Sequence, residues 1–138
     1  MTTKYLLDTC AVLWIANRTH MSSSTLAALR NAHESGQPAR VSLITAWELG
    51  LLSSHNRLPS TQEPRELFDE FIAQPGIALQ VLTVEILIQA SFLPGPIHRD
   101  PADRIIVATA RALDMTLVTD DRLILDYANK GYVRALPC

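Results

Sequence analysis

Short apolar segments alternate along this chain with longer segments whose apolar residues recur at helical spacing. The short segments predict strands at residues 5–7, 39–42, 78–82, 116–118 and 132–136. The longer ones predict helices over 11–16 and 25–34, around Glu48, over 64–72 and 84–92, from 101 onward, and over 122–127. Strands that alternate with helices form a mostly parallel sheet covered on both faces. The sequence therefore predicts an α/β fold with a central sheet of about five strands.

The length of 138 residues suits one domain with a buried core and is short for two, so we expect a single domain over residues 1–138. Twelve basic and 14 acidic side chains give a formal net charge of -2. Bulk charge thus offers no argument for nucleic-acid binding. Local arginines can still attract a polyanion once metal ions neutralise an acidic site.

Cysteine usage and hydropathy bear on the compartment. Cys10 and Cys138 make no disulfide framework and have no histidines at zinc-ligand spacing, which fits a reducing cytoplasm. The first apolar segment is broken by Asp8, unlike a signal peptide, and the longest apolar run covers only residues 10–16. Roughly 20 apolar residues are needed to span a bilayer. We expect a cytoplasmic protein that is neither secreted nor membrane-embedded.

Two acids interrupt the apolar faces of predicted helices. Glu48 stands in a helical stripe otherwise made of Ile44, Trp47, Leu51 and Leu52, of which Trp47 is expected in the core. Asp103 shares a helix face with Ile106, Val107 and Ala110. Burying an unpaired carboxylate is costly, so such groups are protonated, paired with a cation or placed at the rim of a cleft.

Other acids follow predicted strands directly. Asp8 comes after the first strand, and the pair Asp120 and Asp121 comes after the fourth. Ligands of parallel sheets collect at the carboxyl ends of strands, where Glu48 and Asp103 can join these residues. One divalent metal would satisfy all of them, and oxygen ligands suit Mg²⁺ or Mn²⁺ better than Zn²⁺. A carboxylate cage of this kind suits phosphoryl chemistry.

Each acid also has a purely structural explanation. Asp8 can cap the helix that follows it, and Asp100 with Pro101 forms a good helix start, which puts Asp103 in the first turn. One of Asp120 and Asp121 can cap the next helix. The histidines, which show no mutual ligand spacing, are expected in loops or on the surface: His20, His33, His55 and His98.

Several motifs together resemble PIN-domain nucleases, specifically VapC-type toxins of type II toxin–antitoxin systems. They are residues 6–9 (LLDT), 44–50 (ITAWELG), 56–58 (NRL), 98–104 (HRDPADR), 108–110 (ATA) and 117–121 (LVTDD). They occur in the family's order from residue 5 to beyond 121. The set is specific, although each motif is short.

The resemblance implies a PIN-like fold and a Mg²⁺- or Mn²⁺-dependent endoribonuclease. Its catalytic acids would be Asp8, Glu48, Asp103 and Asp121, with Asp120 as the alternative for the fourth. Asp8 and Asp103 would hold the metal. It also implies homodimers and a cognate VapB-like antitoxin. Candidates for steering the RNA backbone are Arg57, Arg99, Arg104 and Arg122.

Two rival functions are also compatible with these residues. Asp8 could be the nucleophile of a Mg²⁺-dependent phosphotransferase. The haloacid-dehalogenase pattern, however, has a second acid where this chain has Cys10. Alternatively, a PIN-like domain could bind RNA or protein without cutting, but a pure RNA binder gains nothing from carboxylates facing phosphate.

Overall fold

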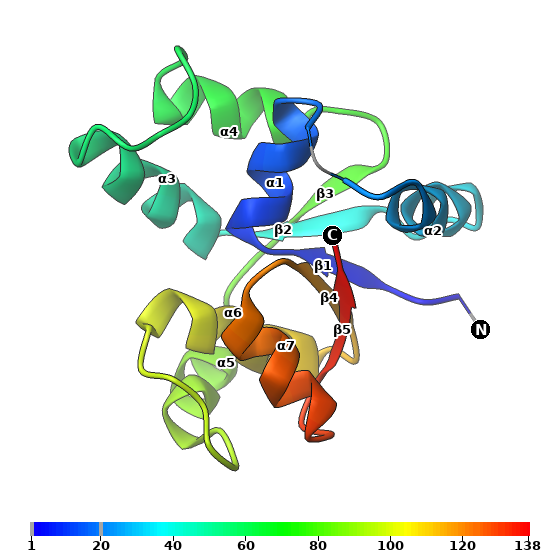
Figure 1. Cartoon of the computed structure of the whole chain (residues 1–138), viewed down its shortest axis with the longest axis vertical. Helices are drawn as coiled ribbons and strands as arrows, with labels where there is room; N and C mark the ends of the chain where they lie inside the picture. Colours follow the sequence, from blue (N-terminus) through cyan, green and yellow to red (C-terminus); the bar gives the residue numbers. More distant parts are fainter. Residues whose placement is uncertain (1, 20) are drawn as a thin grey trace.

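The structure is a computed structural model that describes residues 2–19 and 21–138. The strands are β1 (Tyr5–Leu7), β2 (Ala39–Ser42), β3 (Ile77–Gln80), β4 (Thr116–Thr119) and β5 (Arg134–Pro137). The helices are α1 (Thr9–Ala16), α2 (Ser23–Glu34), α3 (Ile44–Ser54), α4 (Pro64–Ile72), α5 (Val84–Gln89), the 3₁₀ helix η1 (Ala90–Phe92), α6 (Pro101–Ala112) and α7 (Arg122–Asn129). Figure 1 shows their arrangement along the chain.

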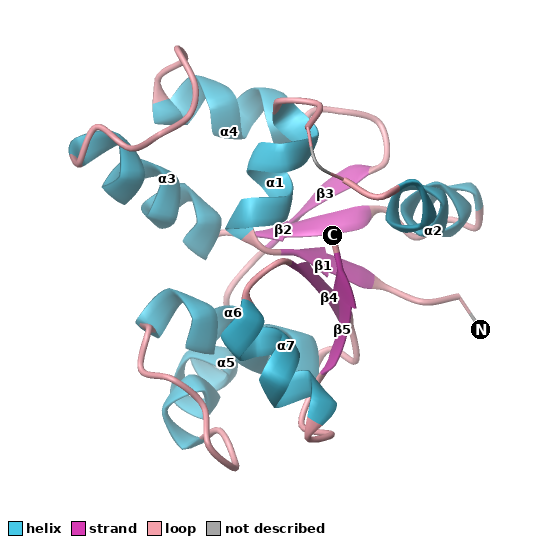
Figure 2. Ribbon diagram, viewed as in Figure 1, coloured by secondary structure: helices cyan, strands magenta, loops and turns pink. Residues whose placement is uncertain are grey.

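The five strands form one parallel sheet in the order β3-β2-β1-β4-β5. Helices cover both faces, with α1, α3 and α4 on one side and α5, α6 and α7 on the other (Figure 2). This arrangement confirms the predicted α/β fold. The chain leaves β1 toward β2 on one side and returns to β4 on the other, so β1 and β4 are neighbours at the point where the strand order reverses.

The two faces of β1 separate two cores, because successive strand residues point to opposite sides of a sheet. Leu7 packs with Val12 and Phe71 in the core under α1 and α4. Leu6 packs with Ile106 and Ile124 in the core under α6 and α7. All are nearly inaccessible to solvent, so the central strand is fixed from both sides.

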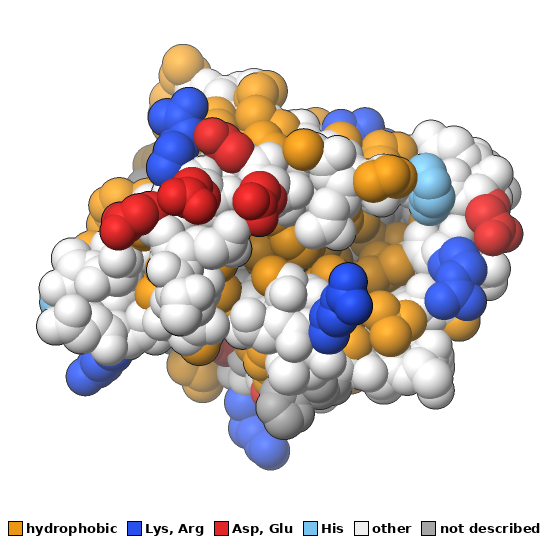
Figure 3. All heavy atoms as spheres, turned by 90° about the horizontal axis from the view of Figure 1, so that it is seen from above, with side chains coloured by type: hydrophobic (Ala, Val, Ile, Leu, Met, Phe, Trp, Pro, Cys, Tyr) orange, Lys and Arg blue, Asp and Glu red, His pale blue; other side chains and the backbone are white. Residues whose placement is uncertain are grey.

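Helix α4 shows how the outer layer is built. Pro64 occupies the first turn, where its missing amide costs nothing, and Leu67 and Phe71 are buried. The opposite side of α4 carries charged side chains, which Figure 3 shows gathered over it. Among them Arg65 and Asp69 form an exposed ion pair at 2.8 Å. No helix within residues 2–19 and 21–138 has both the length and the apolar character that crossing a membrane requires.

Several element boundaries differ from the prediction. Helix α1 begins at Thr9 rather than at residue 11, because Asp8 already acts as its N-cap. The helix predicted to residue 92 tightens into η1 for its last turn. The strand predicted at 78–82 covers Ile77–Gln80, and β5 begins at Arg134 after a turn at Gly131, whose φ is 89°.

The prediction of a core position for Trp47 is wrong, since its side chain is 50% exposed. The buried positions of α3 are Thr45 and Leu49, with Glu48 half-buried beside them. The helix is rotated relative to the apolar stripe because its inner face packs on α1, where Thr9 lies within hydrogen-bond distance of Thr45 at 3.2 Å. By contrast, the predicted inner face of α6, which carries Asp103, is confirmed by the burial of Ile106, Val107 and Ala110.

Candidate active site

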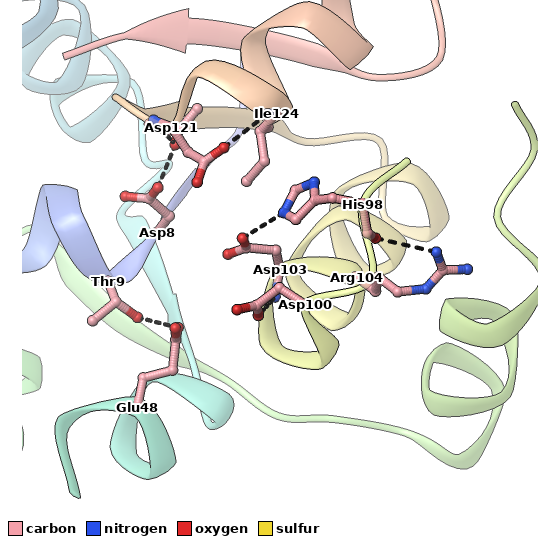
Figure 4. A network of polar contacts seen from close by, with 10 residues as sticks. Asp8, Thr9, Glu48, His98, Asp100, Asp103, Arg104, Asp121 and Ile124 are labelled. Atoms are coloured by element: carbon pink, nitrogen blue, oxygen red, sulfur yellow. Dashed lines mark hydrogen bonds and ion pairs between the residues drawn. The ribbon is translucent and has the colours of Figure 1, made fainter. Parts of the chain in front are cut away.

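The carboxyl ends of β1 and β4 lie side by side. Leu7 pairs with Val118 across the sheet, and the amide of Asp8 donates to the Val118 carbonyl at 3.1 Å. A cavity of about 410 Å³ opens at this point. Its lining includes six acids: Asp8, Glu48, Asp100, Asp103, Asp120 and Asp121. The acids expected to converge therefore line one cavity, to which α1, α3, α6 and the β4–α7 turn each contribute (Figure 4).

Asp8 is nearly inaccessible, with 5% of its surface exposed. Its Oδ1 accepts a 2.8 Å hydrogen bond from the Ala11 amide, and its Oδ2 accepts one from the Thr119 hydroxyl. Burial raises the pKa of Asp8 to about 7 against these two hydrogen bonds, and the nearby charges of Asp103 and Asp121 add to the rise. Because burial disfavours the charged form of Asp8, a cation beside the carboxylate would stabilise that form.

Glu48 reaches the cavity from α3, half-buried. The Thr9 hydroxyl, 39 residues away in the chain, donates to its Oε1 at 2.5 Å. Burial raises the pKa of Glu48 to about 7, opposed by the Thr9 hydrogen bond and reinforced by Asp103, Asp100 and Asp8. A carboxyl group that titrates near neutral pH is suited to exchanging a proton with a reacting water.

Asp103 lies in the first turn of α6, with its carboxylate facing the cavity. Asp100 is the N-cap of this helix, as the sequence predicts, and accepts from the Asp103 amide at 3.0 Å. The imidazole Nε2 of His98 lies 2.7 Å from Asp103 Oδ2. Burial raises the pKa of Asp103, the His98 hydrogen bond opposes this rise, and the charges of Asp100 and Asp121 reinforce it.

Of the two acids after β4, Asp121 is the one that faces the cluster. It is the N-cap of α7, where its Oδ1 accepts from the Ile124 amide at 3.0 Å. It also offers a carboxylate oxygen within 4.8 Å of ligand atoms on His98 and Asp103. Asp120 is exposed and belongs to no such group among the described residues.

The donor atoms fit a divalent cation. Asp103 belongs to two groups whose ligand atoms lie within 4.8 Å of one another, one with His98 and Asp121 and the other with Glu48 and Asp100. Asp8 lines the same cavity but belongs to neither group. In the described part of the chain, no lysine or arginine forms an ion pair with these acids. Without a metal, protonation relieves part of the repulsion between these carboxylates, and a bound cation would neutralise their charge instead.

The four arginines expected to steer the RNA backbone differ in whether their side chains are already bound within the protein. Arg104 is not a free surface cation, because its Nε donates to the Ala90 carbonyl at 2.9 Å and its Nη1 to the His98 carbonyl at 3.3 Å. It therefore braces the loop before α6. Arg57, Arg99 and Arg122 are exposed.

A larger hollow of about 670 Å³ lies at the other end of β4 and β5. Both of its arginines are already engaged there: Arg111 donates to the Tyr132 carbonyl, and Arg134 pairs with Asp114 at 2.5 Å. It carries no cluster of catalytic groups, so the smaller acidic cavity is the better candidate.

His98 is the site residue that the sequence reasoning missed. It lies in a loop, as expected, but its side chain is only 18% exposed and contacts Asp103. His33 and His55 are exposed, as predicted, and His20 lies outside the described residues. Spacing between histidines gave no signal because the partner of His98 is a carboxylate five positions later.

Comparisons with known proteins bear on this fold. The chain is similar to VapBC2 from Rickettsia felis bound to a DNA fragment from their promoter, with TM-score 0.69 and 16% identity over 98% of each chain. It is also similar to FitAcB from Neisseria gonorrhoeae, with TM-score 0.57 and 22% identity over 96% of each chain. At these identities the likeness concerns the fold. No curated protein sequence matches. The family model described as PIN domain matches residues 5–130, and the chain therefore belongs to the PIN-domain family.

Proposed function

We propose that this protein is a Mg²⁺- or Mn²⁺-dependent endoribonuclease and the toxin of a type II toxin–antitoxin system. The observation that carries the proposal is the convergence of Asp8, Glu48, Asp103 and Asp121 from four separate segments on one cavity. PIN-domain membership and the likeness to VapBC2 and FitAcB support it. We take residues 1–138 as one domain, since one sheet joins segments from both ends of the chain.

In this proposal Asp8 and Asp103 hold the metal, and Asp121 completes the cluster directly or through water. The bound ion would polarise the scissile phosphate and lower the pKa of the attacking water. Glu48, oriented by Thr9, takes the proton from that water as it attacks phosphorus in line. The bond from phosphorus to the 3′ oxygen breaks, which leaves a 5′-phosphate and, after protonation by solvent, a 3′-hydroxyl. Arg57, Arg99 and Arg122 are exposed and available for the RNA backbone.

We further propose a VapB-like antitoxin and a second copy of this chain as protein partners, in the cytoplasm. Both would bury apolar surface, and exposed apolar side chains are available on α5 and η1, where Val84 is 75%, Ile88 52% and Phe92 74% exposed. Free thiols at Cys10 and Cys138 are compatible with a reducing compartment.

The proposal is tested with antitoxin-free protein and end-labelled total RNA in Mg²⁺, in Mn²⁺ and in EDTA. We expect fragments with 5′-phosphate ends in both metals, none in EDTA and none from Asp8→Asn. Glu48→Gln should bind Mn²⁺ and lose cleavage by about 10²–10⁴-fold.

Two outcomes would contradict the proposal. Cleavage that survives EDTA or Asp8→Asn would exclude the metal mechanism. RNA binding that is the same with and without EDTA, in wild type and in Asp8→Asn, and without cleavage, would favour a non-catalytic PIN-like domain.

A further inference from the structure

His98 is the only non-acidic residue in the close groups of potential ligands among the described residues. Its Nε2 contacts Asp103 Oδ2 at 2.7 Å, and both side chains are 18% exposed. Figure 4 shows the other oxygen of Asp103 turned away from the imidazole, toward Asp8 and Glu48. The imidazole thus engages one oxygen of the carboxylate and leaves the other directed at the cavity.

The loop that carries His98 is held from two sides. Arg104, on α6, donates to the His98 carbonyl at 3.3 Å and to the Ala90 carbonyl at 2.9 Å. Tyr127, on α7, donates to the Pro94 carbonyl at 2.5 Å. These bonds tie the loop to α6, which contains Asp103, and to α7, whose N-cap is Asp121. The imidazole is therefore preorganised against the carboxylate.

Within the described part of the chain, the second ring nitrogen of His98 makes no polar contact that would stabilise the fold. Nδ1 is buried and has no hydrogen-bond partner among the described residues. A buried polar atom without a partner destabilises a protein. Among the described residues the bond to Asp103 is the one polar contact of the ring, and it points to a residue of the candidate site.

We propose that His98 is a positioning residue that donates its Nε2–H to Asp103 Oδ2 and so orients this carboxylate to hold a divalent cation through Oδ1. The inference rests on the proposed function, because it assumes that Asp103 is a metal ligand. Ligating carboxylates are oriented by hydrogen bonds from outer partners, whose loss weakens metal binding. The same hydrogen bond opposes the rise in the pKa of Asp103 that burial causes.

The alternative role, in which the imidazole is itself a ligand, is separated by a conservative variant. Glutamine can present an amide N–H near the position of Nε2, whereas leucine has no donor. A positioning role is restored by His98→Gln and abolished by His98→Leu. A ligand role is lost in His98→Leu for every metal. In His98→Gln it is lost for Ni²⁺, which prefers an imidazole nitrogen, whereas the amide oxygen of glutamine can replace the imidazole for Mn²⁺.

The experiment is calorimetric titration of the 138-residue protein at one fixed pH with Mn²⁺ and, separately, with Ni²⁺, together with thermal unfolding in EDTA. For a positioning role, His98→Gln should bind both metals nearly as wild type does, and loss of Ni²⁺ binding alone in His98→Gln would show a ligand role instead. We expect His98→Leu to weaken Mn²⁺ binding by about 10–100-fold and His98→Gln to stay within about threefold of wild type. His55→Leu, at an exposed histidine, is the matched control and should bind as wild type does. In EDTA, His98→Leu should be at least as stable as wild type.

Wild-type affinity in His98→Leu would overturn the inference and leave the proposed function standing. Equal weakening in His98→Gln and His98→Leu would overturn the positioning role, and so would an unfolded His98→Leu. A folded wild type that binds no Mn²⁺ would overturn the proposed function and this inference with it.

Discussion

Three acids of the cavity cap helices and face the site at the same time. Asp8, Asp100 and Asp121 each accept a backbone amide through Oδ1, at the starts of α1, α6 and α7 respectively. A carboxylate has about four lone-pair sites, so one amide bond leaves the group able to bind a cation. The structural and functional explanations of these residues are therefore compatible, although the sequence presents them as alternatives.

Replacing Asp8 by Asn should stabilise the metal-free protein, and the gain should grow with pH. The pKa of Asp8 rises from 3.8 to about 7 on folding, so its contribution to stability is greatest below pH 3.8 and is lost as pH rises to 7. The advantage of Asp8→Asn over wild type should increase by about 2–3 kcal/mol between pH 5 and pH 8. Urea unfolding in EDTA measures it.

The control for this prediction is Asp126→Asn, at an exposed aspartate of α7. It measures the effect of removing an exposed aspartate at the same two pH values. The prediction is contradicted if the stability difference between Asp8→Asn and wild type depends on pH no more than that of Asp126→Asn does. Burying the charged form of Asp8 would then destabilise the fold less than a pKa of about 7 implies.

The loop between η1 and α6 packs closely against the aromatic pair Tyr127 and Tyr132. Gly95 has φ 72°, and a Cβ there would lie 2.4 Å from Cζ of Tyr132, which stacks on Tyr127 with ring centroids 4.8 Å apart. Gly36 has a similar φ of 87° but open space around it. Substituting each glycine by alanine therefore distinguishes the effect of backbone strain, present at both positions, from that of a steric clash, present only at Gly95.

We expect Gly36→Ala to cost about 1 kcal/mol, from the positive φ alone. Gly95→Ala should cost at least about 1 kcal/mol more, because the Tyr132 ring must leave its stacked position. Urea unfolding at one pH gives both values. Equal losses in the two variants would show that the loop moves away from Tyr132 without cost.

The strand order brings carboxylates from distant parts of the chain close enough to repel one another. The β1–β4 pairing brings Asp8 against Thr119, 111 residues later, and places Asp121 beside the same cavity. Acids from both halves of the chain meet there without a lysine or arginine partner in the described part of the protein. A bound cation should stabilise the fold as a whole.

Mn²⁺ at 100 times its dissociation constant should stabilise the wild type by about 2.7 kcal/mol over EDTA. Asp8→Asn, with a weakened site, should gain less, so that its stability advantage at pH 8 shrinks or reverses. Thermal unfolding in MnCl₂, in EDTA and in NaCl of matched ionic strength tests this. Equal gains in both proteins would place the bound Mn²⁺ away from Asp8.

The alternation of strands and helices, the helix start at Asp100 and the acids themselves were predictable from sequence, which offered Asp8 as a possible cap and did not decide between Asp120 and Asp121. Their causes are local: residue spacing decides between helix and strand, and an N-cap acts on amides two or three residues away. The buried face of α6 followed from the same spacing, since its apolar residues form a clean stripe.

The sequence alone does not show which face of α3 is buried, which neighbours surround Glu48 or that His98 contacts Asp103. The apolar face of α3 is broad, and packing on α1 selected Thr45 and Leu49 over Trp47. The contact between Thr9 and Glu48 spans 39 residues, and the bond from His98 to Asp103 depends on a loop braced by Arg104. These features depend on packing between segments that are distant in the chain, whereas residue spacing and capping preferences reflect only neighbours within a few positions.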